Sequence, residues 1–314
     1  MEYIKGFTFG WMSGRGDFRK PEAKESLRLM AERTGSSHVI FALAAHQEHP
    51  QAVEVKYKGE HMVEDDELVD MIRYARTLGL RVILKPTVNC TDGTWRAHIN
   101  FFDIDVPCEP KWRDWFRSYT AYQKHYAAIA EREKCEMFIV GCEMVQSERR
   151  SEEWREVIAG VREVYSGLVS YNTDKYQEGH VKWWDAVDVI SSSGYYPIGD
   201  WEAELDRIER VIAPYGKPFF FAEAGCPSRS GSAQVPNDWG LEGAVSAEEQ
   251  EQFYEAMFRH ASNREWVRGF GLWDWSAHLL HQEKDALSDD GYGVYGKPAE
   301  KVIRQFYEGI AVEA

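Results

Sequence analysis

Two glutamates in this sequence each come directly after a run of apolar residues. Glu143 follows residues 137–142, and Glu223 follows residues 219–222. Because buried parallel strands read as such runs, both carboxyl groups are expected where a strand meets a loop. Two carboxyl groups in one site can act together, since an anionic one attacks an electrophilic carbon while a neutral one donates a proton to the leaving oxygen. Either glutamate taken alone can equally cap a helix or form a structural ion pair.

The elements that would position these glutamates follow one pattern along the whole chain. Short apolar runs alternate with longer amphipathic segments, as expected when buried parallel strands are each followed by a covering helix. Eight such runs occur, at residues 4–9, 39–44, 82–88, 137–142, 168–171, 187–192, 218–222 and 269–273. Eight strand and helix units predict an α/β fold, a single (β/α)8 TIM barrel, and not an open doubly wound sheet. The sequence contains no linker, charge block or internal repeat, so residues 1–314 are interpreted as one catalytic domain.

The segments between the apolar runs carry helix signals. Apolar residues at spacings of three and four predict a helix that ends near Gly79. Ser246 and Glu249 are spaced as a capping box and predict the start of another helix. Further helices are expected at about 112–132 and 298–310, whereas the helix near 181–184 should be short.

The predicted barrel brings the two glutamates together. Active sites of such barrels lie at the C-terminal ends of the strands, and Glu143 and Glu223 end the fourth and seventh strands. These strands face each other across the barrel mouth, which can hold two carboxyl groups ~5 to 5.5 Å apart. That separation suits hydrolysis of a glycosidic bond by double displacement, in which one carboxylate attacks the anomeric carbon and the other group moves the proton.

Several short stretches resemble a known family. They are residues 85–86 (Lys-Pro), 93–96 (Gly-Thr-Trp-Arg), 141–143 (Gly-Cys-Glu), 183–186 (Trp-Trp-Asp-Ala), 195–197 (Tyr-Tyr-Pro), 217–218 (Lys-Pro) and 222–225 (Ala-Glu-Ala-Gly). In their order and placement on the strands, they resemble clan A of the glycoside hydrolases and, more narrowly, the β-mannanases of family 113. The resemblance covers nearly the whole chain. It implies a retaining hydrolase of β-1,4-mannosidic bonds in mannan or manno-oligosaccharides, with Glu223 as nucleophile, Glu143 as acid and base, and no cofactor.

Aromatic residues near the strand ends are expected to contact the substrate or the catalytic pair. Tyr195 follows the sixth strand, beside the seventh in the barrel, so its hydroxyl can donate to Glu223 and keep that carboxylate anionic. Trp273 ends the eighth strand and Trp11 follows the first, and both are expected to form a floor or wall under the reacting sugar. Trp275 is the alternative to Trp273, and packing in the core is the alternative for each tryptophan.

Polar contacts with the sugar are expected from the region after the third strand. Many clan A enzymes carry Asn immediately before the acid/base, whereas this chain has Cys142 there. Asn89 is therefore expected to contact the sugar 2-hydroxyl, with Asn172 as the alternative. Trp95 and Arg96 offer an apolar plate beside hydroxyl-directed donors, although an exposed ion pair with a nearby Asp is the other interpretation of Arg96.

Composition narrows the class of partner. The formal net charge of −15 disfavours nucleic acids and anionic membranes, which are bound through excess Lys and Arg. A neutral or cationic ligand is favoured, in agreement with an oligo- or polysaccharide substrate. The five cysteines form no CxxC pair and are expected to be free thiols. The pairs His46 with His49 and His278 with His281 lack the usual spacing of metal ligands, so no metal site is expected.

The N-terminus shows no basic segment followed by an apolar one, and no apolar stretch approaches the ~18 to 20 residues of a membrane span. A soluble cytoplasmic protein is therefore expected. Two alternative functions remain open: another clan A specificity, such as β-glucosidase or β-glucanase activity, and a sugar-binding barrel that has lost catalysis. Retention of both strand-end glutamates argues against the second. The sequence does not predict the oligomeric state.

Overall fold

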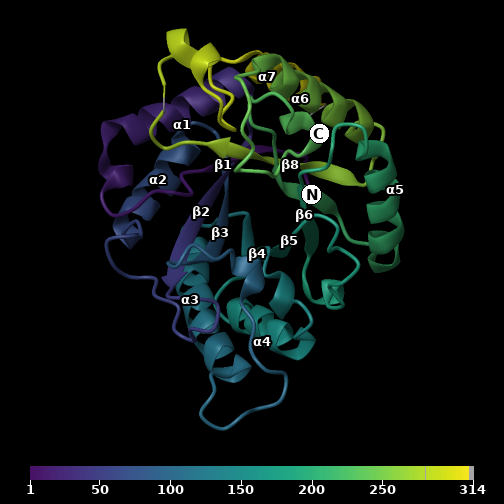
Figure 1. Ribbon diagram of the computed structural model, residues 1–314. Helices are drawn as coiled ribbons and strands as arrows, with labels where there is room; N and C mark the ends of the chain where they lie inside the picture. The colour runs from purple at the N-terminus through teal and green to yellow at the C-terminus, as the bar shows by residue number, and fades with distance from the viewer. Residues whose placement is uncertain (280, 311–314) are drawn as a thin grey trace.

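Eight parallel strands close into a barrel (Figure 1). The computed structural model describes residues 1–279 and 281–310. The strands are β1 Ile4–Phe9, β2 His38–Gln47, β3 Arg81–Cys90, β4 Met137–Cys142, β5 Leu168–Thr173, β6 Val189–Gly194, β7 Phe219–Ala224 and β8 Val267–Trp275. They follow one another around the barrel in chain order, and β8 pairs with β1 to complete it. The prediction of a (β/α)8 TIM barrel is confirmed.

Helices surround the strands (Figure 1). They are α1 Pro21–Thr34, α2 Asp65–Thr77, α3 Trp112–Arg132, α4 Ser151–Arg162, α5 Trp201–Ile212, α6 Ala247–Ala261 and α7 Pro298–Gly309. Short 3-10 helices lie in the loops: η1 Asp17–Arg19, η2 Arg96–His98, η3 Val145–Ser147, η4 Trp184–Ala186, η5 Ala213–Tyr215, η6 Ser232–Gln234 and η7 Glu283–Ser288. The connection from β5 to β6 contains η4 and no longer helix among the described residues, which agrees with the short helix expected near 181–184.

The sequence pattern located every strand, with the exact bounds for β1 and β4 and shifted or shorter bounds for the others. β2 and β3 extend to Gln47 and Cys90 because the two strands pair with each other along their whole length. One half of the capping box is wrong. The Ser246 hydroxyl does accept the Glu249 N–H at 3.3 Å, but the Glu249 carboxylate accepts the backbone N–H of Gly231 at 2.8 Å. The tertiary structure places the loop that contains Gly231 beside the start of this helix, so the Glu249 carboxylate binds that loop and not the backbone of Ser246.

The barrel interior is filled by a small apolar cluster drawn entirely from the strands. Its buried members are Ile4, Ile40, Ile83, Met137, Ile139, Val189, Phe220 and Ala222. A much larger buried cluster packs the outer strand faces against the helices. Side chains two residues apart in a strand share a face, so Lys85 follows Ile83 inward on β3. On β4 an irregularity between Ile139 and Cys142 interrupts this alternation just before Glu143. Polar groups therefore lie on an apolar floor at the C-terminal end of the barrel.

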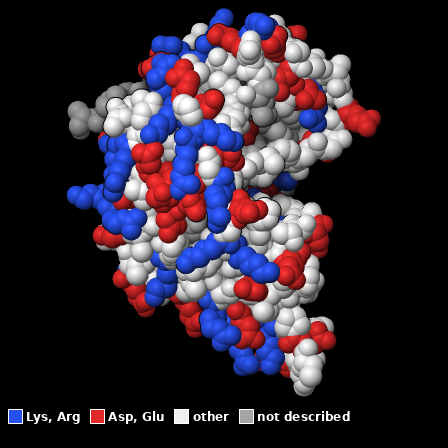
Figure 2. All heavy atoms as spheres, turned by 90° about the vertical axis from the view of Figure 1, so that its left-hand side faces the viewer, with Lys and Arg blue, Asp and Glu red and all other residues white. Residues whose placement is uncertain are grey.

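Charged side chains of both signs are interspersed on the face that carries α1 and α2 (Figure 2). Ion pairs such as Arg19 with Glu64 at 2.6 Å and Lys24 with Asp70 at 2.7 Å join neighbouring elements there. Although the whole chain has more acidic than basic residues, the acidic side chains on this face lie among Lys and Arg side chains. Within the described residues, the helices are too short or too polar to cross a lipid bilayer.

Candidate active site

Glu143 and Glu223 lie close together at the C-terminal end of the barrel. Glu143 directly follows β4 and has a left-handed backbone, φ 54°, with its N–H donating to the Asn172 carbonyl at 2.7 Å. Glu223 is the penultimate residue of β7, so the strand end expected at residue 222 is two residues early. The exposed fractions are 7% for Glu143 and 4% for Glu223. A carboxylate oxygen of each residue and the Cys142 sulfur all lie within 4.8 Å of one another.

Three donors hold the Glu223 carboxylate. Lys85 Nζ lies 2.6 Å from Oε1, the Cys142 thiol donates to the same oxygen at 3.2 Å, and the Tyr195 hydroxyl donates to Oε2 at 3.0 Å. The contact predicted for Tyr195 is confirmed. Burial by itself would raise the pKa of Glu223, but the positive charges of Lys85 and then Arg96 outweigh it and hold that pKa below its ordinary value. Glu223 is therefore the anionic member of the pair.

Glu143 has a different environment. The Ser193 hydroxyl donates to Oε1 at 2.8 Å, and the Trp95 indole N–H and the Arg96 guanidinium lie 3.3 and 3.5 Å from Oε2. Burial, followed by the negative charge of Glu223, raises the pKa of Glu143 despite the Arg96 charge. The two carboxyl groups therefore differ in protonation at the same pH, and Glu143 can carry the proton.

Both glutamates open onto a cavity of about 500 Å³. All six residues predicted to contact the substrate line it: Trp11, Asn89, Trp95, Arg96, Tyr195 and Trp273. Further residues that the sequence analysis did not single out as part of the site also line it, among them Cys90, Asp174, Lys175, Asn237 and Trp239. The cavity thus has carboxyl groups at its base, with indole rings and polar side chains around them.

Indole rings from two loops and from β8 meet at one side of the cavity. The Trp11 and Trp273 ring centroids are 5.0 Å apart, and Trp239 packs against both at 5.9 and 6.2 Å. Trp239 is 57% exposed, which leaves one of its faces free. Trp275, the alternative to Trp273, is buried in the core, where its indole N–H donates to the Ser26 carbonyl at 3.1 Å. Aromatic surface suited to a sugar ring therefore comes from Trp11, Trp273 and Trp239.

Arg96 is mostly buried and joins Asn89 to the catalytic pair. Its guanidinium donates to the Asn89 side-chain oxygen at 3.0 Å and to the Cys142 carbonyl at 2.9 Å. The alternative of an exposed ion pair with an Asp is therefore wrong, because Arg96 is instead directed at Glu143. Asn172, the alternative to Asn89, is fully buried in β5 and donates to Ser193 Oγ at 3.1 Å. Of the two asparagines, Asn89 lines the cavity.

Lys85 and Ser193 touch the catalytic carboxylates and were missed by sequence reasoning as functional residues. Lys85 is 1% exposed and lies inside a strand that otherwise reads as apolar. A lysine is almost never fully buried without a partner, so its position within an apolar run was a usable signal for a buried anion. Ser193 carries no such signal, because serines occupy three consecutive positions of β6, at residues 191–193.

Cys142, Glu143 and Glu223 are also the one trio among the described residues with metal-ligating atoms close enough to hold an ion. Lys85 and Arg96 already place two positive charges against these carboxylates, at 2.6 and 3.5 Å. A cation at the same place would be repelled by both. The charges fit a paired acid and base better than a metal centre.

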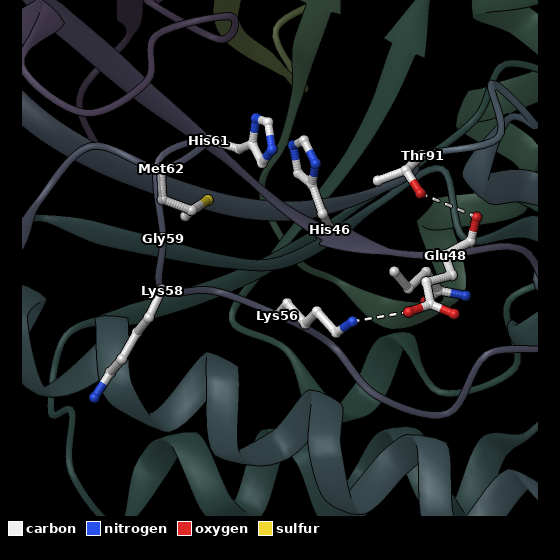
Figure 3. Close-up of a pocket in the computed structure, with 9 residues that line it drawn as sticks. His46, Glu48, Lys56, Lys58, Gly59, His61, Met62 and Thr91 are labelled. Carbon is white, nitrogen blue, oxygen red and sulfur yellow. Dashed lines mark hydrogen bonds and ion pairs between the residues drawn. The ribbon is translucent and has the colours of Figure 1, made fainter.

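A second hollow, of about 240 Å³, lies beside the ends of β2 and β3 (Figure 3). In it the rings of His46 and His61 stack 5.0 Å apart and nearly parallel. His49 instead accepts the backbone N–H of Gln51 at 3.2 Å. His46 therefore pairs with a residue from the following loop and not with His49, its neighbour in the sequence.

Comparisons with known proteins agree with this geometry. The sequence model described as Glycoside Hydrolase Family 113 matches residues 7–297. Two structures of a GH113 β-1,4-mannanase, one of them of a complex, are 64% identical to the chain, cover 99% of it and all of the other chain, and have TM-scores of 0.98 and 0.97. The GH113 β-mannanase AaManA from Alicyclobacillus acidocaldarius, in complex with ManMIm, is 45% identical, covers 99% of both chains and has a TM-score of 0.95.

More distant matches share the fold alone. A β-D-glucuronidase of Dictyoglomus thermophilum is 16% identical, with a TM-score of 0.67, and the match covers 99% of this chain and 51% of the other. A search among curated proteins gave no match. The strong similarities therefore lie within one family and extend over the whole barrel.

Proposed function

The chain belongs to glycoside hydrolase family 113, and we propose that it hydrolyses β-1,4-mannosidic bonds of mannan and manno-oligosaccharides with Glu223 as nucleophile and Glu143 as acid and base. One observation carries the residue assignment. Two buried carboxyl groups with oxygens within 4.8 Å have pKa values moved in opposite directions, and the closer cation, Lys85, lies at 2.6 Å from Glu223, whereas Arg96 lies at 3.5 Å from Glu143. This separation fits a retaining mechanism, whereas inversion needs the groups ~6.5 to 9.5 Å apart to admit a water.

In the first step, Glu223 attacks the anomeric carbon while the glycosidic C–O bond breaks. Oε1 already accepts from Lys85 and Cys142, whereas among the described residues Oε2 accepts only from Tyr195, so Oε2 is the oxygen with a lone pair free for attack. Glu143 gives its proton to the departing oxygen, so that the leaving sugar departs as a neutral alcohol. The product of the step is a glycosyl ester of Glu223.

In the second step, water attacks the same carbon and breaks the ester. The Glu223 charge that raised the pKa of Glu143 is absent from the ester, so the pKa of Glu143 falls and its carboxylate is ready to take a proton from water. Hydrolysis releases the sugar, restores the Glu223 carboxylate and reprotonates Glu143. Two inversions at one carbon leave the product with the β configuration of the substrate.

The cavity supplies the contacts that a mannosyl unit needs. Trp273 and Trp11 offer flat apolar surface for the sugar ring, and Asn89 with Arg96 offers polar groups for its hydroxyls. The barrel that carries these residues is proposed to be the complete catalytic domain. The substrate class follows from the 64% and 45% identical family members, both described as β-mannanases.

Proton NMR during early hydrolysis of mannohexaose tests the mechanism. The first reducing-end signal from the newly formed product should be that of the β anomer, with the α anomer appearing later by mutarotation. If the α anomer appears first, double displacement by this pair is wrong. Parallel reactions with cellohexaose and xylohexaose should be much slower than the reaction with mannohexaose.

Azide separates the roles of the two glutamates. In Glu143→Ala, azide replaces the missing base in the second step and should accelerate turnover of an activated aryl β-mannoside, giving the β-glycosyl azide. In Glu223→Ala, azide attacks directly and should give the α-glycosyl azide. The reverse pattern would exchange the two assignments.

A further inference from the structure

A third carboxyl group faces the cavity beside the catalytic pair. Asp174 directly follows β5, lines the same cavity as Glu143 and Glu223, and is 8% exposed. Its charged neighbour is the Lys175 ammonium, 3.9 Å away, which also lines the cavity. Within the described part of the chain, no other side chain donates a hydrogen bond to the Asp174 carboxylate or forms an ion pair with it.

The strand register places Asp174 next to Glu143 and nearer to the mouth. The Glu143 N–H donates to the carbonyl of Asn172, which fixes the end of β4 against β5. Asp174 lies two residues beyond Asn172 and just past the last residue of β5, so the chain carries it beyond the Glu143 contact toward the cavity mouth. The pKa of Asp174 is raised to about 7, first by burial and next by the Glu143 charge, with Glu223 contributing less. Glu143 raises this pKa more than Glu223 does, which agrees with the position of Asp174 beside Glu143.

Other buried glutamates show what a structural carboxylate looks like in this protein. Glu148 accepts from the Tyr171 and Thr173 hydroxyls, and Glu178 accepts from the Tyr196 hydroxyl and the Arg207 guanidinium. Neither of these two glutamates lines the catalytic cavity. A buried carboxylate is costly unless donors surround it. Asp174 has few protein donors and an open side, so its remaining acceptor capacity is directed at whatever fills the cavity.

Resting on the proposed function, we propose that Asp174 and Lys175 bind the hydroxyl groups of the departing sugar, the unit whose glycosidic oxygen is protonated by Glu143. The departing unit must extend from the protonated oxygen on the Glu143 side, which is where these two residues lie. A carboxylate beside an ammonium offers both an acceptor and a donor to neighbouring sugar hydroxyls. The same pair would hold an incoming sugar when the glycosyl ester is transferred to an acceptor other than water.

The test compares two leaving groups in one set of variants. Asp174→Ala, Asp174→Asn and Lys175→Met are measured against wild type and against Asp185→Asn, which removes an exposed carboxylate paired with Arg155 on the outer surface. Mannotetraose has a sugar leaving group, whereas 2,4-dinitrophenyl β-mannobioside leaves without a hydroxyl for these residues to bind. The aryl substrate also reports that each variant is folded and that its catalytic pair works.

Asp174→Ala should lower kcat/KM for mannotetraose about 10- to 100-fold, as expected when hydrogen bonds to a charged group are lost. Its kcat/KM for the aryl substrate should stay within about threefold, with Asp174→Asn and Lys175→Met intermediate on mannotetraose and Asp185→Asn unchanged on both. With added mannobiose as acceptor, the ratio of transfer to hydrolysis should also fall in Asp174→Ala.

Equal losses on both substrates, or an unchanged transfer ratio, would overturn the binding role of Asp174 and leave the proposed function intact. A wild-type protein that cleaves neither substrate would instead overturn the proposed function and, with it, the site for a departing sugar. The two failures are therefore distinguishable from the wild-type rates alone.

Discussion

Two pairs among the buried glutamates of this protein differ in what surrounds them. Glu143 and Glu223 line the 500 Å³ cavity at the C-terminal end of the barrel. Glu148 and Glu178 are 1% and 0% exposed and lie near β5 and β6, where hydroxyl groups and a guanidinium hold them. Both pairs are close to charge-bearing neighbours, yet only one pair can reach a substrate.

The pKa values sharpen the comparison. Burial raises the pKa of Glu148 to about 8, even though the Thr173 and Tyr171 hydroxyls lower it. This raised pKa resembles that of a catalytic acid, but the Glu148 carboxyl group is buried and does not reach the cavity. In the cavity, the pKa of Glu143 is raised while that of Glu223 is lowered. Opposite shifts in two carboxyl groups that share a cavity identify acid–base chemistry, whereas burial and one shifted pKa do not.

The largest expected difference is in activity after neutralising one member of each pair. Glu223→Gln should lower kcat/KM on mannotetraose by about 10⁴-fold or more, because the attacking anion is lost. Glu148→Gln should stay within about threefold of wild type, because the group does not contact the substrate cavity. Steady-state kinetics on both variants, with melting curves to confirm folding, checks the contrast. A folded Glu148→Gln protein with a comparable loss would remove the distinction between the two pairs.

Lys85 should have the next largest effect, because the positive charge of its ammonium contributes most to the lowered pKa of Glu223 and so keeps this carboxylate anionic. Lys85→Met should lower kcat/KM about 100-fold near neutral pH through loss of a buried charge partner. Removing the cation raises the pKa of Glu223, so the acidic limb of the pH profile should move to higher pH. Lys24→Met, at an exposed ion pair, is the matched control. An acidic limb that stays in place would show that Lys85 does not set this pKa.

The alkaline limb of the pH profile should report Glu143. Wild-type kcat/KM should follow a bell whose upper limb reflects loss of the Glu143 proton, at a pH raised by burial and by the Glu223 charge. The limbs give macroscopic constants of the coupled pair. Glu143→Gln, assayed with a dinitrophenyl leaving group that needs no proton, should lose the alkaline limb and keep the acidic one. Persistence of the alkaline limb in that variant would assign it to another group.

The smallest expected effect is on the pH dependence of stability. Between pH 4.5, the ordinary value for Glu, and about 8, folded Glu148 keeps a proton that the unfolded chain has released. The folded state then binds more protons, so this group's contribution to stability falls as pH rises through that window. In Glu148→Gln, the loss of unfolding free energy from pH 5 to pH 8 should shrink by about 3 kcal/mol, because each pKa unit corresponds to about 1.4 kcal/mol. Urea unfolding at both pH values measures it, and identical slopes for wild type and variant would contradict a raised pKa.

Much of the fold could be predicted because its signals are local. The helix expected at 112–132 matches α3, and each apolar run corresponds to a strand, since periodicity and burial act over a few residues. Strand lengths and the second half of the Ser246 capping box were not predictable in this way. Both depend on partners brought from elsewhere, such as β3 for β2 and Gly231 for Glu249.

The strand-end residues of the site were predictable from the topology, and the loop residues Trp11, Trp95 and Arg96 were also predicted and line the cavity. Glu143, Glu223 and Tyr195 are found at the barrel mouth because the topology carries every strand end to one face. Trp239 and Asp174 line the same cavity, yet neither terminates an apolar run of the sequence as Glu143 does. Trp239 lies in a loop, and two polar residues, at 172 and 173, separate Asp174 from the apolar run at 168–171, so the run did not single it out.

The sequence by itself determined the barrel, the two strand-end carboxyl groups and hence the class of chemistry, because alternating runs of strand and helix have one closed arrangement that gathers their ends. The family resemblance already implied that Glu223 is the anion, and only the tertiary structure supplies the physical reason for that choice. That choice depends on Lys85 lying 2.6 Å from Glu223 and on Ser193, Trp95 and Arg96 surrounding Glu143. Coulomb energies and hydrogen bonds change over a few ångströms. Residues 138 positions apart acquire that proximity only when the barrel closes.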